Sequence, residues 1–160
     1  IVMGLNQGMQ PIAGYNFGAK LYGRVNKVLK LTIIYATAVT TFGFLVGMLV
    51  PDLVVGIFTS DAELTELCVT GLRITVMFFP IIGFQMVTSN FFQSIGMAGK
   101  AIFLSLTRQM LILLPCLLIL PQFFGVAGVW YSMPVSDLLA SLIALVMLVC
   151  QFRKFRTSPL

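Results

Sequence analysis

Long apolar runs without charge dominate the chain, with short polar segments between them. The clearest run, residues 31–50, has twenty consecutive uncharged residues. At about 1.5 Å per residue in a helix, such a run spans the roughly 30 Å hydrocarbon core of a bilayer. Predicted spans cover residues 31–50, 74–96, 101–121 and 126–150. Residues 1–18 add the last turns of another helix, so the pattern predicts an all-α polytopic transmembrane bundle with about four full spans and the end of a fifth.

The third span is divided by Arg108, which leaves residues 109–121 as its longest uncharged part. It reaches membrane length only if Arg108 lies near the inner surface and extends its guanidinium to the headgroups. The chain opens at Ile1 directly in apolar sequence, without the basic start of a signal peptide. We therefore expect it to be a fragment.

Composition supports a membrane protein. Of 160 residues, 59% are hydrophobic and 9% are charged, and the mean hydropathy is +1.02. A soluble domain carries about a quarter of its residues as charges. A soluble amphipathic bundle would also need polar helix faces, and residues 31–50 offer only Thr and Tyr, so the composition excludes a water-soluble globule.

The chain lacks histidine, which removes the usual general base and the commonest zinc ligand. Cys68, Cys116 and Cys150 lie far apart without a CxxC pair, so we interpret them as small hydrophobic residues. The net charge is +5, but the basic residues flank the apolar runs and do not form a patch interleaved with aromatic residues. We predict no enzyme, no metal site and no nucleic-acid partner.

The charges between the runs predict an orientation. Residues 20–30, 97–108 and 151–160 hold nine of the ten Lys and Arg residues, and only Arg73 lies elsewhere. The positive-inside rule places these segments, and with them the carboxyl terminus, in the cytoplasm. Asp61 is a plausible N-cap of a helix that starts at the outer surface, an interpretation favoured over an acidic binding site.

Asp137 is the one acidic residue inside a predicted span. A central aspartate costs about 2.5–3.5 kcal/mol on insertion scales, so it should face protein or a water-filled cavity. Two roles stay open: a proton or cation relay, and a structural hydrogen bond, for example to a carbonyl freed by Pro134. A direct pair with Arg108 is marginal, because antiparallel packing offsets the two residues. We expect Arg108 to lie at the cytoplasmic surface.

Polar residues form a stripe in the 74–96 span. Gln85, Ser89 and Gln93 recur every four residues and share one helix face, and Thr88, Asn90 and Ser94 add to it. Interhelical hydrogen bonds contribute only about 0.6 kcal/mol on average, so helix association alone does not require so many. We predict that Gln85, Ser89, Asn90 and Gln93 line a substrate cavity.

Bends in the spans are expected at Pro11, Pro80, Pro115, Pro121 and Pro134. Two roles are open to the nearby Phe78, Phe79, Phe84 and Met86: packing, which is favoured, and contact with flat cationic drugs.

Residues 8–19, GMQPIAGYNFGA, resemble the QPxxGYNxGA signature of multidrug and toxic compound extrusion (MATE) transporters. Further similar segments follow in the family's order at residues 91–96, 105–109 and 125–137. The resemblance implies structural roles for Gln10, Pro11, Gly14, Asn16, Gly18 and Arg108. It also implies a twelve-helix transporter with two six-helix lobes in the bacterial inner membrane, of which this chain supplies most of the carboxyl-terminal lobe.

The resemblance implies secondary active efflux of cationic or amphipathic xenobiotics in antiport with sodium ions or protons. The family's acidic coupling residues lie in the first helix or, in some branches, in the seventh and tenth, and the segment similar to the tenth, residues 74–96, has no carboxylate. Coupling is therefore expected in the missing amino-terminal lobe, with Asp137 as a secondary ion-coupling candidate, and the chain alone is not expected to transport. Expected partners are membrane lipid, that lobe and cationic drugs, with no cofactor beyond the coupling ion.

Two alternatives stay open. A lipid-linked saccharide flippase of the same superfamily should carry more charge, above all arginine, in its central cavity. A nontransporting membrane subunit would fit a chain that is natural at this length.

Overall fold

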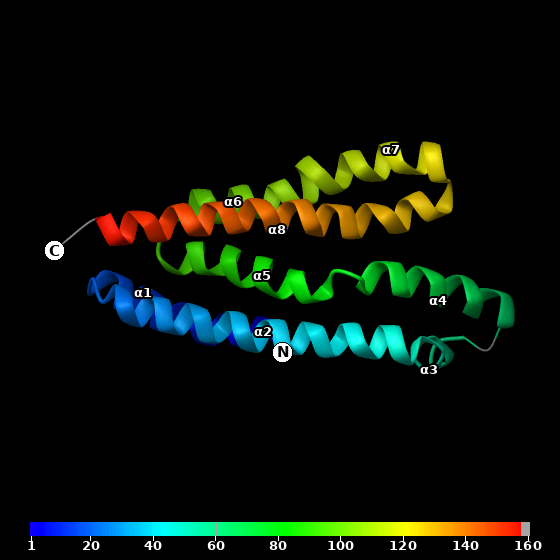
Figure 1. Cartoon of the computed structure of the whole chain (residues 1–160), viewed down its shortest axis with the longest axis horizontal. Coiled ribbons are helices and arrows are strands. Elements are labelled where there is room, and N and C mark those ends of the chain that lie inside the picture. The colour runs from blue at the N-terminus through cyan, green and yellow to red at the C-terminus, as the bar shows by residue number, and fades with distance from the viewer. Residues whose placement is uncertain (60, 158–160) are drawn as a thin grey trace.

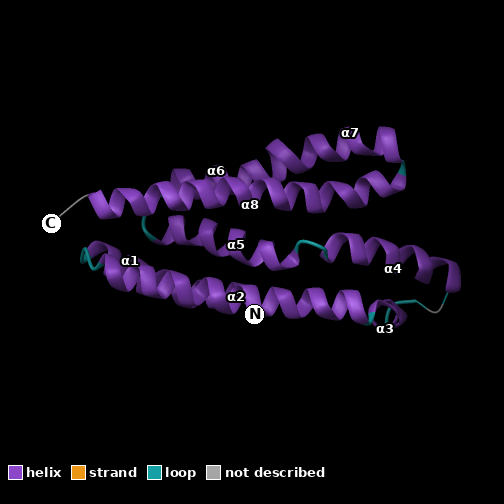
Figure 2. Ribbon diagram, in the orientation of Figure 1, coloured by secondary structure: helices purple, strands orange, loops and turns teal. Residues whose placement is uncertain are grey.

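The computed structural model describes residues 1–59 and 61–157, and every regular element in this part is helical (Figures 1 and 2). The prediction of an all-α bundle is confirmed. The helices are α1 (Val2–Gly18), α2 (Tyr22–Leu49), α3 (Pro51–Gly56), α4 (Ala62–Val76), α5 (Phe79–Ser94), α6 (Ala98–Leu106), a π-helical segment (Thr107–Leu113), α7 (Leu114–Phe124) and α8 (Val126–Thr157). In Figure 1 the long helices run along one common direction, and α5 packs against both α2 and α8.

Three helical stretches of the described chain are long and apolar enough to cross a membrane: Tyr22–Leu49, Ala98–Phe124 and Val126–Phe155. A fourth is present if α4 and α5, which are bent by 49°, form one span. The first stretch begins well before residue 31, because the basic segment that precedes the apolar run is itself helical. Lys and Arg are good helix formers, so the helix extends beyond the apolar part of the sequence.

A helix break falls inside the segment predicted as the 74–96 span. Helix α4 ends at Val76 and α5 begins at Phe79, with Pro80 in its first turn. Proline has no N–H to donate, and its ring clashes with the carbonyl four residues earlier, so one straight helix cannot run through this point. The second span is therefore a bent pair. At the amino-terminal end of this pair, Asp61 caps α4 as predicted, since its Oδ1 accepts from the amides of Glu63 (2.9 Å) and Leu64 (3.3 Å).

The third span is continuous but not regular. Between α6 and α7 the backbone widens into the π-helical segment, where the amide of Leu114 bonds to the carbonyl of Gln109. Pro115 follows directly and cannot donate to the carbonyl of Leu111, as an α-helix would require. The wider turn lets the chain pass this missing donor without a full break.

Close helix contacts form around α5. Its buried Phe91 and Phe92 pack with Met9 of α1, Leu29 of α2 and Leu104 of α6 in one apolar cluster. Helix α1 approaches α5 most closely where a Cβ built on Gly14 would lie 2.9 Å from the carbonyl oxygen of Ser94. The absence of a side chain at this motif glycine is what permits the approach.

We expect Gly14→Ala to destabilise the protein, because the added methyl would meet backbone that cannot move away like a side chain. Overpacking of this kind costs about 1–3 kcal/mol. Gly8→Ala is the matched control in the same helix, since a Cβ there meets nothing within 4 Å. The measurement is the thermal unfolding midpoint of the full-length protein in detergent. Equal midpoints for the two variants would contradict the close approach of α1 to α5.

Candidate functional site

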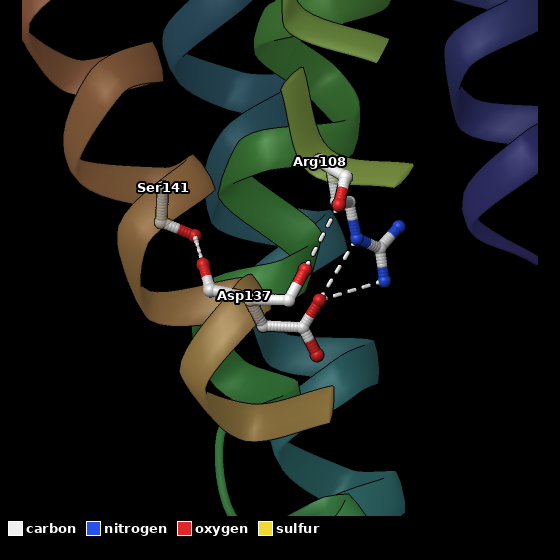
Figure 3. Close-up of polar contacts among 4 residues, drawn as sticks. Arg108, Asp137 and Ser141 are labelled. Atoms are coloured by element: carbon white, nitrogen blue, oxygen red, sulfur yellow. Dashed lines mark hydrogen bonds and ion pairs between the residues drawn. The ribbon is translucent and has the colours of Figure 1, made fainter. Parts of the chain in front are cut away.

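An ion pair joins the third and fourth spans within the membrane part of the bundle. Arg108, in the π-helical segment, places both its Nε and its Nη2 2.8 Å from Oδ1 of Asp137 in α8 (Figure 3). Next to the pair, the hydroxyl of Ser136 donates to the carbonyl of Arg108 (3.0 Å). The hydroxyl of Ser141 donates to the carbonyl of Asp137 (2.6 Å). The two helices are thus connected through side chain and backbone at the same level.

The expectation that a direct pair between Arg108 and Asp137 is marginal was wrong, because the two side chains are in direct contact. Counted along the chain, Arg108 lies several residues further from the turn at Gly125 than Asp137 does, which suggested an offset. The π-helical segment and the proline-containing α7 replace the straight helix on which that count depended. The hydrogen bond from Ser136 to the Arg108 carbonyl shows that the two helices meet with no such offset.

The two partners are buried to different degrees. The side chain of Asp137 is 7% exposed and that of Arg108 is 29% exposed. A buried carboxylate needs a partner, because removal of the counter-charge leaves an unpaired ion in a medium of low polarity. Asp137 therefore faces protein, as predicted, and the guanidinium is the more accessible end of the pair.

Beside the pair lies a polar cavity of about 160 Å³. Its lining comes from α5, α6 and the π-helical segment and consists of Gln85, Met86, Ser89, Asn90, Ser105, Arg108 and Gln109. Arg108 belongs to both features: it lines the cavity and binds Asp137. None of the lining residues is acidic. The one charged group in the lining is the Arg108 guanidinium, which Asp137 neutralises.

Hydrogen bonds order the cavity wall. Asn90 accepts from Nε2 of Gln10 in α1 (3.3 Å) and donates to the carbonyl of Met86 (2.9 Å). The hydroxyls of Ser89 and Ser105 lie 3.2 Å apart, and Ser89 also donates to the carbonyl of Ala101 (3.3 Å). These bonds fix α5 against α1 on one side and against α6 on the other.

Three of the four residues expected in a cavity, namely Gln85, Ser89 and Asn90, lie together in its wall. Gln93 lies one turn further on, is exposed and is not part of the lining. Sequence reasoning missed Ser105 and Gln109 as lining residues. Their spacing of four residues, on either side of Arg108, is the signal that could have indicated a second polar face.

The residues of the 8–19 segment are structural in different ways. Gln10 reaches the cavity wall through Asn90, and Gly14 allows the close approach to Ser94. Asn16 is buried and donates to the carbonyl of Ile12 (2.8 Å). Pro11 is exposed within α1, and a side chain at Gly18 would meet nothing within 4 Å. Through Gln10 and Gly14, the segment holds α1 against α5, which provides part of the cavity wall.

The apolar residues near the polar stripe of α5 lie in different pockets. Met86 lines the polar cavity, whereas Phe84 lies in the wall of a separate apolar pocket with Leu138 of α8.

The three cysteines are free thiols, namely Cys68, Cys116 and Cys150. Across the described residues, no group of three or more Cys, Asp or Glu side chains is placed to hold a metal ion.

Comparison with known proteins gives a consistent result. The MatE family profile matches residues 1–119. Multidrug export protein MepA of Staphylococcus aureus is 28% identical over 145 residues, which cover 91% of this chain and 32% of that protein. The MATE multidrug transporter DinF-BH, solved as a ligand complex, is 37% identical, with a TM-score of 0.90, and the match covers 98% of this chain and 35% of that one.

An inward-facing MATE family transporter of the MOP superfamily has the same fold, with a TM-score of 0.90 at 20% identity over 99% of this chain and 37% of that one. The chain thus spans about a third of the length of the relatives it matches. The family profile covers most of the chain, and its helices superpose closely on those of solved transporters. The chain therefore belongs to the MATE family of multidrug efflux transporters, integral membrane proteins.

Proposed function

We propose that the protein exports cationic or amphipathic xenobiotics by alternating access, in antiport with sodium ions or protons, and that this chain supplies part of the substrate path. The observation that carries the proposal is the polar cavity beside the Arg108–Asp137 pair. The helices around it are bent or irregular, which suits a protein that must change shape. The ligand complex of the multidrug transporter DinF-BH supports a drug as the substrate.

The efflux proposal is favoured over lipid-linked saccharide transport. Arg108 does line the cavity, the one feature expected of a flippase. Its charge is neutralised by Asp137 at 2.8 Å, which leaves no free cation in the cavity for an anionic lipid-linked group. The amide and hydroxyl groups that remain suit an uncharged or weakly polar part of a drug.

We also propose that the carboxyl terminus is cytoplasmic. In Figure 1 the α1–α2 turn, the α5–α6 turn and the end of α8 lie at one end of the bundle. These segments carry most of the basic residues, whereas Asp52 on α3, the N-cap Asp61, and Glu63 and Glu66 on α4 lie toward the other end. This asymmetry supports the basic end as the cytoplasmic one.

Thiol labelling tests this orientation. In a cysteine-free background of the full-length protein, we expect Glu63→Cys to react in intact cells with a membrane-impermeant maleimide. Lys27→Cys should react only after the cells are permeabilised, because both positions are exposed but lie at opposite ends. The reverse pattern would invert the proposed topology.

A cavity-filling substitution tests the substrate path. We expect Asn90→Leu to lower gradient-driven ethidium efflux from drug-sensitive cells by about tenfold, equivalent to about 1.4 kcal/mol. The change removes the hydrogen bond to Gln10 and fills part of the 160 Å³ cavity. Gln93→Leu, one turn away and outside the lining, is the matched control and should transport normally. Imposed sodium and proton gradients identify the coupling ion, and efflux under neither gradient would refute the antiport proposal.

The role of Asp137 as an ion-coupling residue needs a test that separates transport from folding. Asp137→Asn leaves the Arg108 guanidinium without its partner, and breaking a buried pair costs about 3–5 kcal/mol. The double variant Arg108→Gln/Asp137→Asn removes both charges and should recover most of the lost thermal stability. We expect the double variant to remain inactive in gradient-driven efflux at normal expression, because the carboxylate itself is needed. Recovery of transport together with stability would assign the pair a purely structural role.

A further inference from the structure

A second, larger cavity lies apart from the polar site, between α2 and the end of α8, and shares no lining residue with it. Its volume is about 680 Å³, within the range of about 300–1,000 Å³ typical of small-molecule sites. Its long wall is apolar and consists of Leu29, Ile33 and Ile34 of α2 with Phe152 and Phe155 of α8. Ile34 is 52% exposed, so the wall is open to the surroundings of the bundle. We call this feature the α2–α8 groove.

One end of the α2–α8 groove is polar. Tyr22, Asn26 and Lys30 follow one another every four residues and therefore form a single row on the same face of α2. The next turn of that face carries Ile33 and Ile34. Polar donors thus give way to branched aliphatic side chains within one helix turn, the order in which a lipid headgroup meets its acyl chains.

The groove is positively charged at this end. Lys30 supplies an ammonium group, and none of the five acidic side chains of the chain lines the groove. Lys20, in the turn before α2, and Arg24, in its first turn, add further positive charge nearby. An anionic group would therefore be attracted both locally and by the surrounding field.

Aromatic rings gather at the Tyr22 end of the groove. Tyr22, at the first position of the α2 span, stacks on Phe155 with ring centroids 5.0 Å apart and an interplanar angle of 14°. Phe17 adds a further ring 5.7 Å from Phe155. Tyrosine and other aromatic residues at the end of a span are typical of the headgroup region. We therefore expect this end of the groove at the level of the lipid headgroups, with the apolar wall of Ile33 and Ile34 toward the hydrocarbon.

We propose that the α2–α8 groove is a binding site for an anionic phospholipid of the leaflet at the basic end of the bundle. The phosphate lies between the Lys30 ammonium and the Asn26 amide, and an acyl chain lies along Ile33, Ile34 and the two phenylalanines. Basic pockets between membrane helices recognise anionic headgroups in this way. The proposal is independent of the substrate and of the coupling ion.

Native mass spectrometry of the full-length protein with phosphatidylglycerol and phosphatidylcholine of identical chains tests the site. We expect retention of one phosphatidylglycerol in preference to phosphatidylcholine. Lys30→Gln should lower phosphatidylglycerol affinity about fivefold, since one basic residue near the surface contributes about 1 kcal/mol. Ile33→Trp should displace both lipids by filling the groove.

Lys27→Gln is the matched control, because it removes the same charge from an exposed position of α2 that does not line the groove. Its phosphatidylglycerol affinity should stay within twofold of the wild type, on the order of 0.4 kcal/mol. An equal loss of phosphatidylglycerol affinity in Lys27→Gln and Lys30→Gln would show that general surface charge, and not the groove, attracts the lipid. Equal retention of the two lipids by the wild type, or no effect of Ile33→Trp, would overturn the site.

Discussion

The hydrocarbon core of a bilayer offers no hydrogen-bond partner, so each polar group in a membrane span must find one within the protein. Several serines and threonines of these spans meet the requirement locally, by donating to the carbonyl four residues earlier. Thr32, Thr40, Thr75, Thr88, Ser132 and Ser141 all do so. The groups that cannot be satisfied within their own helix, Arg108, Asp137, Gln10, Asn90 and Ser89, instead bond between helices and thereby fix how the helices meet.

The ion pair and the cavity are two parts of one arrangement. Asp137 needs a counter-charge because it is buried, and Arg108 supplies it from a segment whose backbone is already irregular. Because the guanidinium is also the side of the pair that meets the cavity, any ligand there faces a charge that is already compensated. The cavity can thus be polar without being strongly charged, which fits the broad substrate class proposed for the protein better than a site built for one ion.

The sequence was informative wherever a single helix determines the answer. Uncharged runs located the spans, because membrane length and polarity act on each helix separately. The four-residue spacing placed Gln85 and Ser89 on one face, and Asp61 was recognisable as a cap. The relation between helices was not accessible in the same way, because the Arg108–Asp137 pair depends on the offset of two helices and the cavity lining depends on how three segments meet. The break before Pro80 was indicated by proline as a possible bend, but its position within the predicted span followed only from the structure.

The π-helical segment has a consequence for the whole third span. Its wider turn holds one extra residue, and one residue corresponds to about 100° of rotation around a helix axis. The residues after the segment are therefore turned by about this angle relative to their positions in an uninterrupted α-helix, and among them Leu114 and Leu118 are 53% and 63% exposed. A one-residue deletion here would restore regular winding and turn all of α7 relative to α6. The segment thus sets which face of α7 each later residue occupies, in the same continuous helix that holds Arg108 against Asp137.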